Sequence, residues 1–294
     1  MKVHVVANPT AGRGRTPRLV EDLERALAAR GAATSIHFTT GPGEATRHLA
    51  GLAPGDFDRL VVVGGDGTLH EAVNARPEPL PWPVAVVPVG TANLVARDAG
   101  LALHAPLDRI VRRVLEGRPW TVDLLATDRG RALAVAGVGL DAEIVRAVAR
   151  VRSGGLGGYT KWIGPIAQTF VDYRPRALEV VVDGGAPIEG GAVVVQNTYC
   201  YGGLFSLSRK ATMDDGRLEV VVLRRARRSS YFRVLLRAYA GRLEGDHEVA
   251  MVSGTTVEIR ASDPVSVQLD GDPAGTTPLT VRIEPRALTL LREG

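Results

Sequence analysis

The pattern of hydrophobic and polar positions changes once along the chain, near residue 122. Before that point, short apolar runs alternate with longer segments whose apolar residues recur at helical spacing. Continuous apolar runs are typical of strands buried on both faces, and helical spacing is typical of amphipathic helices. The alternation therefore predicts an α/β domain built on a mostly parallel sheet.

This first part supplies a regular series of elements. The predicted strands are Lys2–Ala7, Thr34–Thr40, Arg59–Gly65 and Trp82–Gly90, and the predicted helices are Thr16–Gly31, Gly43–Ala53, Leu107–Gly117 and a segment that begins at Thr68. Thr16 stands where an N-cap is expected. Thr68 and Glu71 form the T-x-x-E pattern of a capping box, which places the start of that helix directly behind the third strand.

After residue 122, short strand-like stretches dominate, among them residues 279–285 and 287–291. Turn dipeptides separate several of them, namely Asp183-Gly184, Asp215-Gly216 and Asp270-Gly271. This pattern predicts a β-rich antiparallel domain with two helical insertions, near Asp141–Arg152 and Ser229–Arg242. The chain is thus expected to hold an α/β domain with a Rossmann-like sheet in residues 1–122, which residues 285–294 would complete, and a β-rich domain in residues 123–284.

Composition restricts the class of protein. The 294 residues are 45% hydrophobic and 23% charged, as in soluble globular proteins. No apolar run reaches the roughly 18 residues of a membrane span, and the chain opens on a predicted strand rather than on a signal peptide. Cys200 is the sole cysteine, so no internal disulfide can form. These features favour a cytoplasmic protein.

The charge balance permits anionic partners without selecting one. The formal net charge is +4, and only Lys2, Lys161 and Lys210 are lysines among the 36 basic residues, so the other 33 are arginine. With so much alanine and glycine, this bias indicates genomic composition. Nucleotides, phosphorylated lipids and a negative membrane surface all remain compatible partners, and we expect no nucleic-acid partner. The six histidines are scattered without metal spacing, so we expect no zinc site.

Three loops that follow predicted parallel strands carry informative residues: Asn8–Arg15 (NPTAGRGR), Gly64–Thr68 (GGDGT) and Pro88–Asp98 (PVGTANLVARD). In an open parallel sheet, ligands bind at the carboxyl ends of the strands, where helix N-termini present free N–H groups. The glycines of GGDGT would let an anion reach these amides, and Asp66 would face the anion through Mg²⁺ or its bound water. The alternative is a tight turn that happens to need glycines.

Two common phosphate-binding motifs are excluded by their residues. The Walker P-loop needs a Gly-Lys-Ser/Thr end, and no lysine lies between Lys2 and Lys161. The dinucleotide fingerprint G-x-G-x-x-G would have to start at Gly12, and Pro17 stands where its third glycine belongs. The sequence therefore predicts a nucleotide polyphosphate site of a different kind.

The motif GGDGTLHEAVNA, with NPTAGRGR before it and PVGTANLVARDAG after it, resembles the diacylglycerol-kinase catalytic domain of soluble bacterial lipid kinases. The wider superfamily also contains sphingosine, ceramide and NAD kinases. The resemblance runs nearly the whole length, through AGVGLDAE (Ala136–Glu143), QNTYCYGG (Gln196–Gly203), MDDGRLEV (Met213–Val220) and LDGDPAG (Leu269–Gly275). It implies a Mg²⁺-dependent kinase that phosphorylates a lipid hydroxyl with ATP, in the cleft between the two domains.

The resemblance also implies roles for particular residues. The ATP-binding residues would be Asn8, Gly12, Gly14, Gly64, Gly65, Asp66, Gly67, Thr68, Gly90, Thr91 and Asn93. Asp123 would join Asp66 in a carboxylate network, and Asp215 with the backbone carbonyls of Thr212 and Arg217 would hold Mg²⁺. Asp272 falls where the family has a glutamate as general base. Leu94 and Arg209 also depart from the family pattern, which has an aspartate and a proline there.

Partners follow from the same resemblance. A lipid substrate implies work at a membrane surface, and the helix predicted within Arg224–Arg242 would turn Tyr231, Leu235, Ala238 and Tyr239 to one side and arginines to the others. This segment is either a membrane-contacting helix or an ordinary domain helix with a basic side. An exposed strand edge would allow a homodimer. Two other functions stay open: an NAD kinase, and a non-catalytic nucleotide or lipid sensor.

Overall fold

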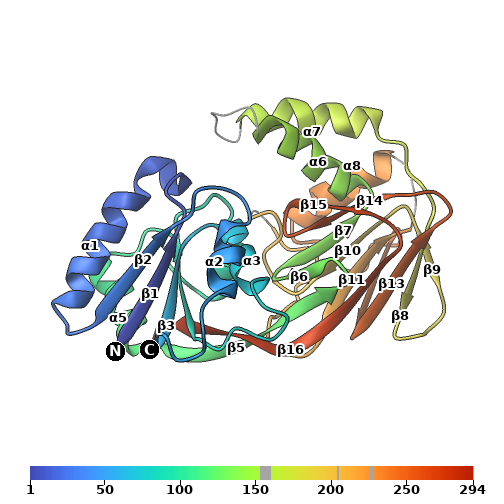
Figure 1. Cartoon of the computed structure of the whole chain (residues 1–294). Coiled ribbons are helices and arrows are strands. Elements are labelled where there is room, and N and C mark those ends of the chain that lie inside the picture. Colours follow the sequence, from blue (N-terminus) through green and yellow to red (C-terminus); the bar gives the residue numbers. More distant parts are fainter. Residues whose placement is uncertain (153–159, 204, 225–227, 294) are drawn as a thin grey trace. The chain divides into compact units, whose positions relative to one another are not determined.

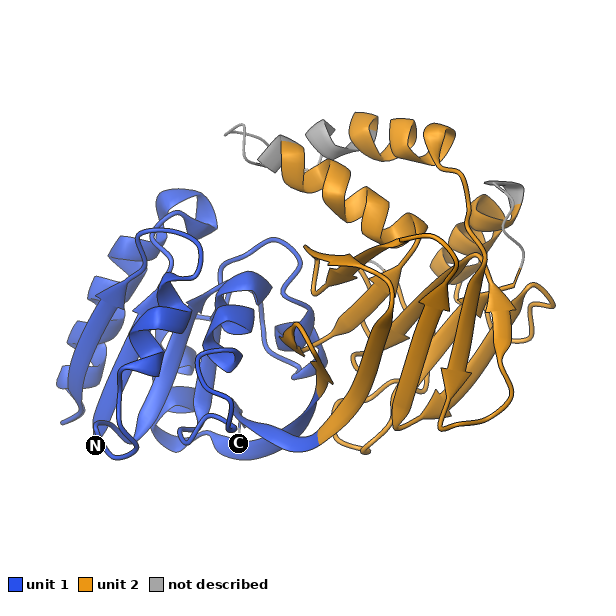
Figure 2. Ribbon diagram, turned by 45° about the vertical axis from the view of Figure 1, so that its right-hand side comes forward, with its two compact units in different colours: residues 1–124, 285–294 blue, residues 125–284 orange. Residues whose placement is uncertain are grey.

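The chain folds as an α/β part followed by a β-rich part, as its pattern predicts (Figure 1). The computed structural model describes residues 1–152, 160–203, 205–224 and 228–293. They form two compact units, residues 1–124 with residues 285–294, and residues 125–284 (Figure 2). Two strands, β5 (Arg118–Thr127) and β16 (Leu279–Arg292), begin in one unit and end in the other.

The first unit is a parallel sheet with helices on both faces. Its strands β1 (Lys2–Ala7), β2 (Ala33–Phe38), β3 (Arg59–Gly64) and β4 (Val84–Pro88) lie in the order β2-β1-β3-β4, all parallel. Its helices are α1 (Thr16–Ala28), α2 (Glu44–Ala50), α3 (Asp66–Val73), α4 (Leu94–Asp98) and α5 (Leu107–Glu116). Alternate strand residues such as Val5 and Val61 pack against Leu23 and Val111, so α1 and α5 cover one face. The other face carries α2 and α3 (Figure 1).

The second unit is a sandwich of two antiparallel sheets with helices outside one of them. The six-stranded sheet has the order β12-β11-β10-β7-β14-β15, and the other sheet contains β16-β13-β8-β9, with β6 paired to β5. The strands are β6 (Gly130–Ala132), β7 (Val135–Val138), β8 (Leu178–Val182), β9 (Ile188–Gly190), β10 (Ala192–Gln196), β11 (Leu218–Leu223), β12 (Val249–Gly254), β13 (Thr256–Ala261), β14 (Ser266–Leu269) and β15 (Asp272–Thr276). Apolar residues of both sheets, for example Val195 and Ile259, form the core between them.

Three helices belong to the second unit: α6 (Leu140–Arg152), α7 (Thr160–Asp172) and α8 (Arg228–Tyr239). They lie on the outer side of the six-stranded sheet (Figure 1), where Leu140 and Tyr231 pack with Ala192 and Leu223. The sequence predicted only two of them. α7 was missed because Gly164 and Pro165 interrupt its apolar pattern, although the helix continues through both.

Three local predictions are wrong in detail. Residues 279–285 and 287–291, expected as two strands, form the single strand β16, which passes through Arg286 in the left-handed region at φ 56°. Thr16 is the first residue of α1 rather than its N-cap, and its hydroxyl donates to the Ala11 carbonyl instead. α3 begins two residues before Thr68, at Asp66. Side-chain patterns identified these elements, whereas backbone contacts decided their ends.

Candidate active site

The start of α3 lacks the predicted capping box. Gly65 is the N-cap, and it has no side chain that could bond to the first turn of the helix. Glu71 instead accepts hydrogen bonds from the backbone N–H groups of Gly43 and Ala45, at 2.9 and 3.0 Å, and so caps α2. The capping-box prediction was wrong because the Glu71 carboxylate bonds to the start of the neighbouring helix α2 and not to the start of its own helix. The N–H groups at the start of α3 are consequently not covered by a side-chain cap.

The three glycines of GGDGT meet different neighbours. A Cβ on Gly64 would lie 2.4 Å from the Thr68 hydroxyl oxygen and 2.6 Å from its Cβ. A Cβ on Gly65 would lie 3.1 Å from the Gly90 Cα, so two glycine backbones pack against each other. A Cβ on Gly67 would meet nothing within 4 Å, and this residue is exposed. Contacts within the fold explain why positions 64 and 65 are glycine, but they do not explain why position 67 is glycine.

The loop after β4 packs on GGDGT through its own glycine. A Cβ on Gly90 would lie 2.5 Å from the Gly65 Cα and 2.8 Å from the Asn93 side-chain oxygen. Asn93 is buried in the left-handed region at φ 50°, and its side-chain amide donates to the Gly90 carbonyl at 2.8 Å. Thr91 is exposed between them. Asn93 therefore shapes the loop, and Thr91 is the member that faces outward.

The glycine-rich loop after β1 completes this edge of the sheet. The Asn8 side-chain oxygen accepts from the backbone N–H and the hydroxyl of Thr10, at 3.0 and 2.8 Å. Gly12 and Gly14 have φ values of 61° and 79°, and a Cβ on Gly12 would lie 3.3 Å from the Val89 Cβ. Because β1, β3 and β4 are parallel neighbours, the structure brings all three predicted nucleotide loops to one edge.

The predicted carboxylates of the first unit occupy different settings. Asp66 is half-buried in the first turn of α3. Asp123 lies on β5 with 2% of its surface exposed, and its Oδ1 accepts from the Arg286 backbone N–H at 2.7 Å. That bond holds the left-handed residue inside β16, so Asp123 has a structural role. A network between Asp123 and Asp66 stays a prediction.

In the second unit, Asp272 stands at the end of a two-residue hairpin turn. Leu269 pairs with Asp272 across the turn, and Asp270 and Gly271 both have positive φ, 50° and 86°, as a type I′ turn requires. The Asp270 carboxylate accepts from three successive backbone N–H groups, at 2.7, 2.8 and 3.0 Å, which belong to Leu133, Ala134 and Val135. Asp272 itself is exposed. The turn thus presents one carboxylate outward and uses the other as an anchor.

The predicted metal residues lie on the turn before β11. Asp215 accepts from the Arg217 backbone N–H at 3.0 Å, which closes a local turn, and Thr212 donates its hydroxyl to Asp214 at 2.7 Å. A carboxylate with two backbone carbonyls is an all-oxygen set, which fits the preference of Mg²⁺. Within the described residues, no group of three or more His, Cys, Asp or Glu side chains is arranged to hold a metal ion.

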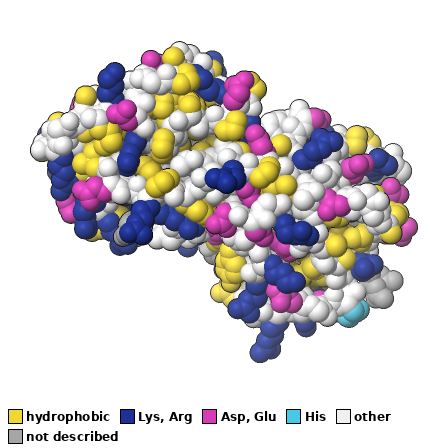
Figure 3. Space-filling view, turned by 90° about the horizontal axis from the view of Figure 1, so that it is seen from below, with side chains coloured by type: hydrophobic (Ala, Val, Ile, Leu, Met, Phe, Trp, Pro, Cys, Tyr) yellow, Lys and Arg dark blue, Asp and Glu magenta, His cyan; other side chains and the backbone are white. Residues whose placement is uncertain are grey.

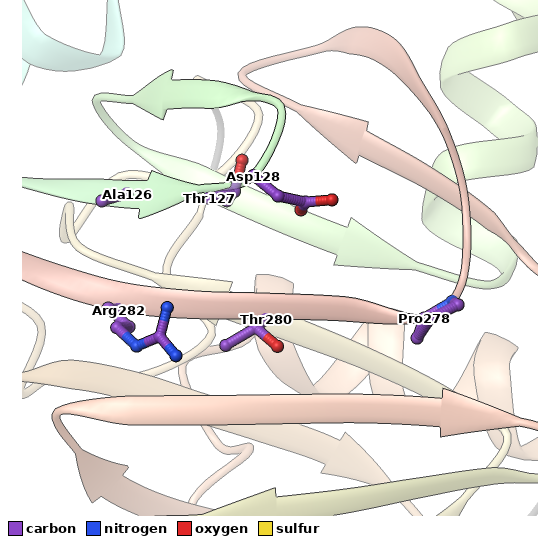
Figure 4. Close-up of a pocket in the computed structure, with 6 residues that line it drawn as sticks. All are labelled: Ala126, Thr127, Asp128, Pro278, Thr280 and Arg282. Carbon is purple, nitrogen blue, oxygen red and sulfur yellow. The ribbon is translucent and has the colours of Figure 1, made fainter. Parts of the chain in front are cut away.

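The pocket drawn in Figure 4 does not contain the predicted site. It has a volume of about 410 Å³ and lies within the second unit, between the end of β5 and the start of β16. Its lining residues are Ala126, Thr127, Asp128, Pro278, Thr280 and Arg282. None of them was predicted to act in binding or catalysis. The predicted nucleotide loops lie in the first unit instead, at the carboxyl ends of β1, β3 and β4.

Two protein-family models match this chain. A family model described as the YegS C-terminal NAD kinase beta sandwich-like domain matches residues 134–292, more than half of the chain. The diacylglycerol kinase catalytic domain matches residues 2–127. This chain belongs to the YegS-type diacylglycerol kinase family.

Relatives within this family cover nearly the whole chain. A diacylglycerol kinase of Bacillus subtilis (strain 168) is 27% identical over 288 residues, 94% of this chain and 91% of its own length. A diacylglycerol kinase of Mycobacterium tuberculosis (strain H37Rv) is 27% identical over 302 residues, 99% of this chain and 95% of its own. The prediction of a lipid kinase, made from GGDGT and its flanking loops, is confirmed at the level of the family.

Solved structures agree on the fold. A protein from Bacillus anthracis str. Sterne has a TM-score of 0.81 at 23% identity, over 99% of this chain and 95% of its own. A diacylglycerol kinase from the same strain has a TM-score of 0.75 at 19% identity, over 99% and 97%. At these identities the likeness concerns the fold. It supports the predicted combination of a mostly parallel α/β sheet with an antiparallel β-rich part.

Three residues of this diacylglycerol kinase family member depart from the family pattern, and each has a simple structural environment. Leu94 is buried at the start of α4, where a charge would be costly. Arg209 is exposed. Asp272 is held by a turn whose backbone is fixed on both sides. The basic side chains show no concentration on the face drawn in Figure 3, where they lie among acidic ones.

The sequence missed a polar cluster beside the Asp272 turn. Asp141, at the start of α6, accepts hydrogen bonds from Tyr201 and from Gln268. All three residues lie in or next to motifs that carried the family resemblance, but none was assigned a role. A carboxylate directly after the apolar run AGVGL was the available signal, since such a residue needs partners.

Proposed function

We propose that this family member transfers the γ-phosphate of ATP to the hydroxyl of a diacylglycerol-like lipid, with Mg²⁺. The names of its relatives support the acceptor class. The observation that carries the nucleotide half is the space around Gly67. The N-cap Gly65 makes no side-chain capping bond, a Cβ on Gly67 would meet no atom within 4 Å, and a phosphate bound there would meet backbone N–H groups and the positive end of the helix dipole.

The proposed chemistry needs one proton acceptor. The lipid hydroxyl oxygen forms a bond to the γ-phosphorus while the bond between that phosphorus and the β,γ-bridging oxygen breaks, and ADP leaves with the electron pair. Asp272 accepts the hydroxyl proton and later releases it to water. Its exposure suits this role, because the carboxylate must reach a bound lipid and then return the proton to solvent.

Mg²⁺ would be held by oxygen atoms of this chain. Asp66 lies beside the proposed phosphate site, and Asp215 with the carbonyls of Thr212 and Arg217 forms a second all-oxygen set. When bound, the ion neutralises charge on the phosphates during transfer. Among the residues of the chain, the loop amides bind and orient the nucleotide, and Asp123 keeps the β16 backbone in place.

Contact with a lipid bilayer is the third part of the proposal. The exposed face of α8 consists of Phe232, Leu235, Leu236 and Tyr239, which are 56%, 43%, 53% and 72% exposed. Their spacing of three, four and seven residues puts them on one face. The predicted face was partly wrong, since Tyr231 and Ala238 point inward. Residues 225–227 of the predicted segment lie outside the described residues.

This face fits the interface of a bilayer better than a charged ligand. Arg233 and Arg237 on the same helix pair with Asp246 and Glu248, at 2.7 to 2.8 Å, so their charge is balanced within the protein. An apolar stripe with two aromatic rings is typical of helices that lie in the interfacial region. No helix among the described residues is long and apolar enough to cross a membrane.

A kinase assay tests the catalytic part. Purified protein is incubated with labelled ATP, Mg²⁺ and separate acceptors: diacylglycerol or sphingosine in mixed micelles, or NAD in solution. We expect label in diacylglycerol, and a loss of kcat of about 10²- to 10⁴-fold in Asp272→Asn. Asp263→Asn, which removes an exposed carboxylate of the same unit, is the matched control. Label in NAD alone would favour an NAD kinase, and no turnover by the unchanged protein would favour a sensor.

Vesicle sedimentation tests the bilayer contact. Leu236→Glu should lower binding to phosphatidylcholine–phosphatidylglycerol vesicles by about tenfold, because it places a charge in the interfacial region. Phe38→Glu makes a comparable change on an exposed apolar residue of the first unit and should leave binding unchanged. Equal losses in both variants, or a concentration-dependent dimer that only Leu236→Glu dissociates, would contradict a membrane-facing role for α8.

A further inference from the structure

A chain of hydrogen bonds leads from Asp141 to the turn that carries Asp272. The Tyr201 hydroxyl donates to Asp141 Oδ1, and the Gln268 side-chain amide donates to Asp141 Oδ2 at 2.6 Å. The other end of the Gln268 side chain accepts from the Gly271 backbone N–H at 2.8 Å. Gly271 is the residue directly before Asp272. Every link in this chain belongs to the second unit.

The surroundings of this chain leave it little freedom. Gln268 is 2% exposed, and its two ends are both engaged. A Cβ on Gly137 would lie 1.8 Å from Asp141 Oδ2 and 2.8 Å from the Gln268 amide nitrogen, so the carboxylate lies directly on the β7 backbone. Burial raises the pKa of Asp141, although the hydrogen bonds from Tyr201 and Gln268 act in the opposite direction. Asp141 is half-buried as a whole, and both of its carboxylate oxygens accept hydrogen bonds within the protein.

The turn is held from two other directions as well. Asp270 binds the chain before β7 through three backbone N–H groups. The Arg129 guanidinium donates to the carbonyls of Ala274 and Pro278, at 2.6 and 2.7 Å, and so braces β15 and the segment after it. Of these side-chain contacts, that of Gln268 with Gly271 is the nearest to Asp272 along the chain. Its loss would free the Gly271 peptide while the rest of the hairpin stays anchored.

We propose that Asp141 and Gln268 are positioning residues that fix the backbone next to Asp272 and thereby aim its carboxylate at the acceptor hydroxyl. The inference rests on the proposed function of Asp272. An aspartate has one methylene less than the glutamate that the family resemblance leads one to expect, so its reach depends more on the backbone. Displacement of a catalytic group by about 1 Å can cost about 100-fold in rate.

The first test compares two substitutions on the same strand. Gln268→Leu removes both hydrogen bonds of the side chain, and we expect kcat for diacylglycerol to fall about 10- to 100-fold with KM for ATP within about twofold. Ser266→Ala is the control, because Ser266 also bonds to α6, through Glu143, but does not touch the turn. It should leave kcat unchanged. If both variants lose activity in proportion to their loss of Tm, the role is structural and the inference fails.

The second test separates this inference from the proposed function. Gln268→Leu in an Asp272→Asn background should cause no further loss of kcat, because the positioned group is already gone. Amide exchange of Gly271, followed by NMR, needs no activity: exchange should be slow in the unchanged protein and faster in Gln268→Leu, but not in Ser266→Ala. If the unchanged protein shows slow amide exchange at Gly271 but no kinase activity, the proposed function alone is refuted. Faster exchange with an unchanged kcat would refute the positioning role alone.

Discussion

The two units build their candidate sites in opposite ways. In the first unit, GGDGT and the loop after β4 meet through bare backbone, with Gly65 and Gly90 in contact and no side chain between them. In the second unit, the turn before Asp272 is held by side chains, namely Asp270, Gln268 and Arg129. Substitutions that add a side chain should therefore disturb the site of the first unit, and substitutions that remove a side chain should disturb the site of the second.

This difference suits the two proposed ligands. A phosphate is recognised by N–H groups that any side chain would obstruct, so a phosphate site gains from glycines. A proton acceptor must be held at a fixed point, which requires polar contacts on the backbone that carries it. Substitutions at the two sites should therefore change stability and activity in different ways.

The largest expected effect is the loss of the Asp270 anchor. Asp270→Ala leaves three backbone N–H groups of buried residues without their acceptor and puts alanine at positive φ, so we expect a loss of about 3–5 kcal/mol in unfolding free energy, measured by urea denaturation. Asp183→Ala is the control, because Asp183 occupies the same kind of turn but binds the exposed Thr255 backbone. A loss as large as that of Asp270→Ala would contradict the role given to burial.

The contrast also explains which parts of the site the sequence could predict. GGDGT was predictable because its constraints lie within a few residues: an apolar strand, glycines and a helix start. The three loops were predicted to share one edge because parallel strands end together. The roles of Asp141 and Gln268 were not predictable, since the hydrogen bond between them joins residues 127 positions apart. Glu71 shows the same limit, because its partners on α2 lie outside any local motif.

The fold was predictable to a similar degree. Alternating apolar runs identified the parallel sheet, and Asp-Gly dipeptides marked turns such as Asp270-Gly271 correctly. The helix α7 was missed because Pro165 is normally a helix breaker. Three of the six histidines, scattered in the sequence, meet in the first unit. Only the folded sheet brings β1, β2 and α2 close enough for that.

The second prediction concerns acid stability, where His4 of the first unit and Asp141 of the second should act with opposite sign. His4 Nε2 lies 2.8 Å from His48 Nε2, and His37 stacks on His48 with 3.6 Å between ring centroids. Burial, with the neighbouring charges of His48 and His37, lowers the pKa of His4 to about 4. In the unfolded chain His4 binds a proton near pH 6.5, whereas in the folded chain it stays neutral down to about pH 4. The free energy of unfolding therefore falls by about 3 kcal/mol as the pH decreases from 6.5 to 4.

Asp141 acts in the opposite direction in the second unit. Its pKa is raised by burial, so the folded state favours the protonated form, and stability is lost as the pH rises through that raised value. Acid should thus destabilise the first unit more than the second, which amide exchange at pH 7 and pH 4.5 would report unit by unit. His4→Gln should flatten the pH dependence of the first unit, and the exposed His104→Gln should not. Equal behaviour of both units would contradict this assignment.

The smallest expected change in stability separates two glycines of the nucleotide edge. A Cβ on Gly90 would lie 2.5 Å from the Gly65 Cα, so Gly90→Ala should cost about 1–3 kcal/mol and shift the loop. Gly67→Ala meets no protein atom within 4 Å and should change the unfolding free energy by less than about 0.5 kcal/mol.

Gly67→Ala should nevertheless weaken ATP binding about tenfold by isothermal titration calorimetry, because its methyl group occupies the space assigned to the phosphate. The exposed Gly55→Ala is a poor comparison, since its φ of 98° strains any side chain, whereas Gly164 on α7 has open space and no positive φ and serves as the control. If Gly67→Ala binds ATP as tightly as Gly164→Ala does, the open space before α3 is not where the phosphates bind. Gly64 and Gly65 would then serve only their contacts with Thr68 and Gly90.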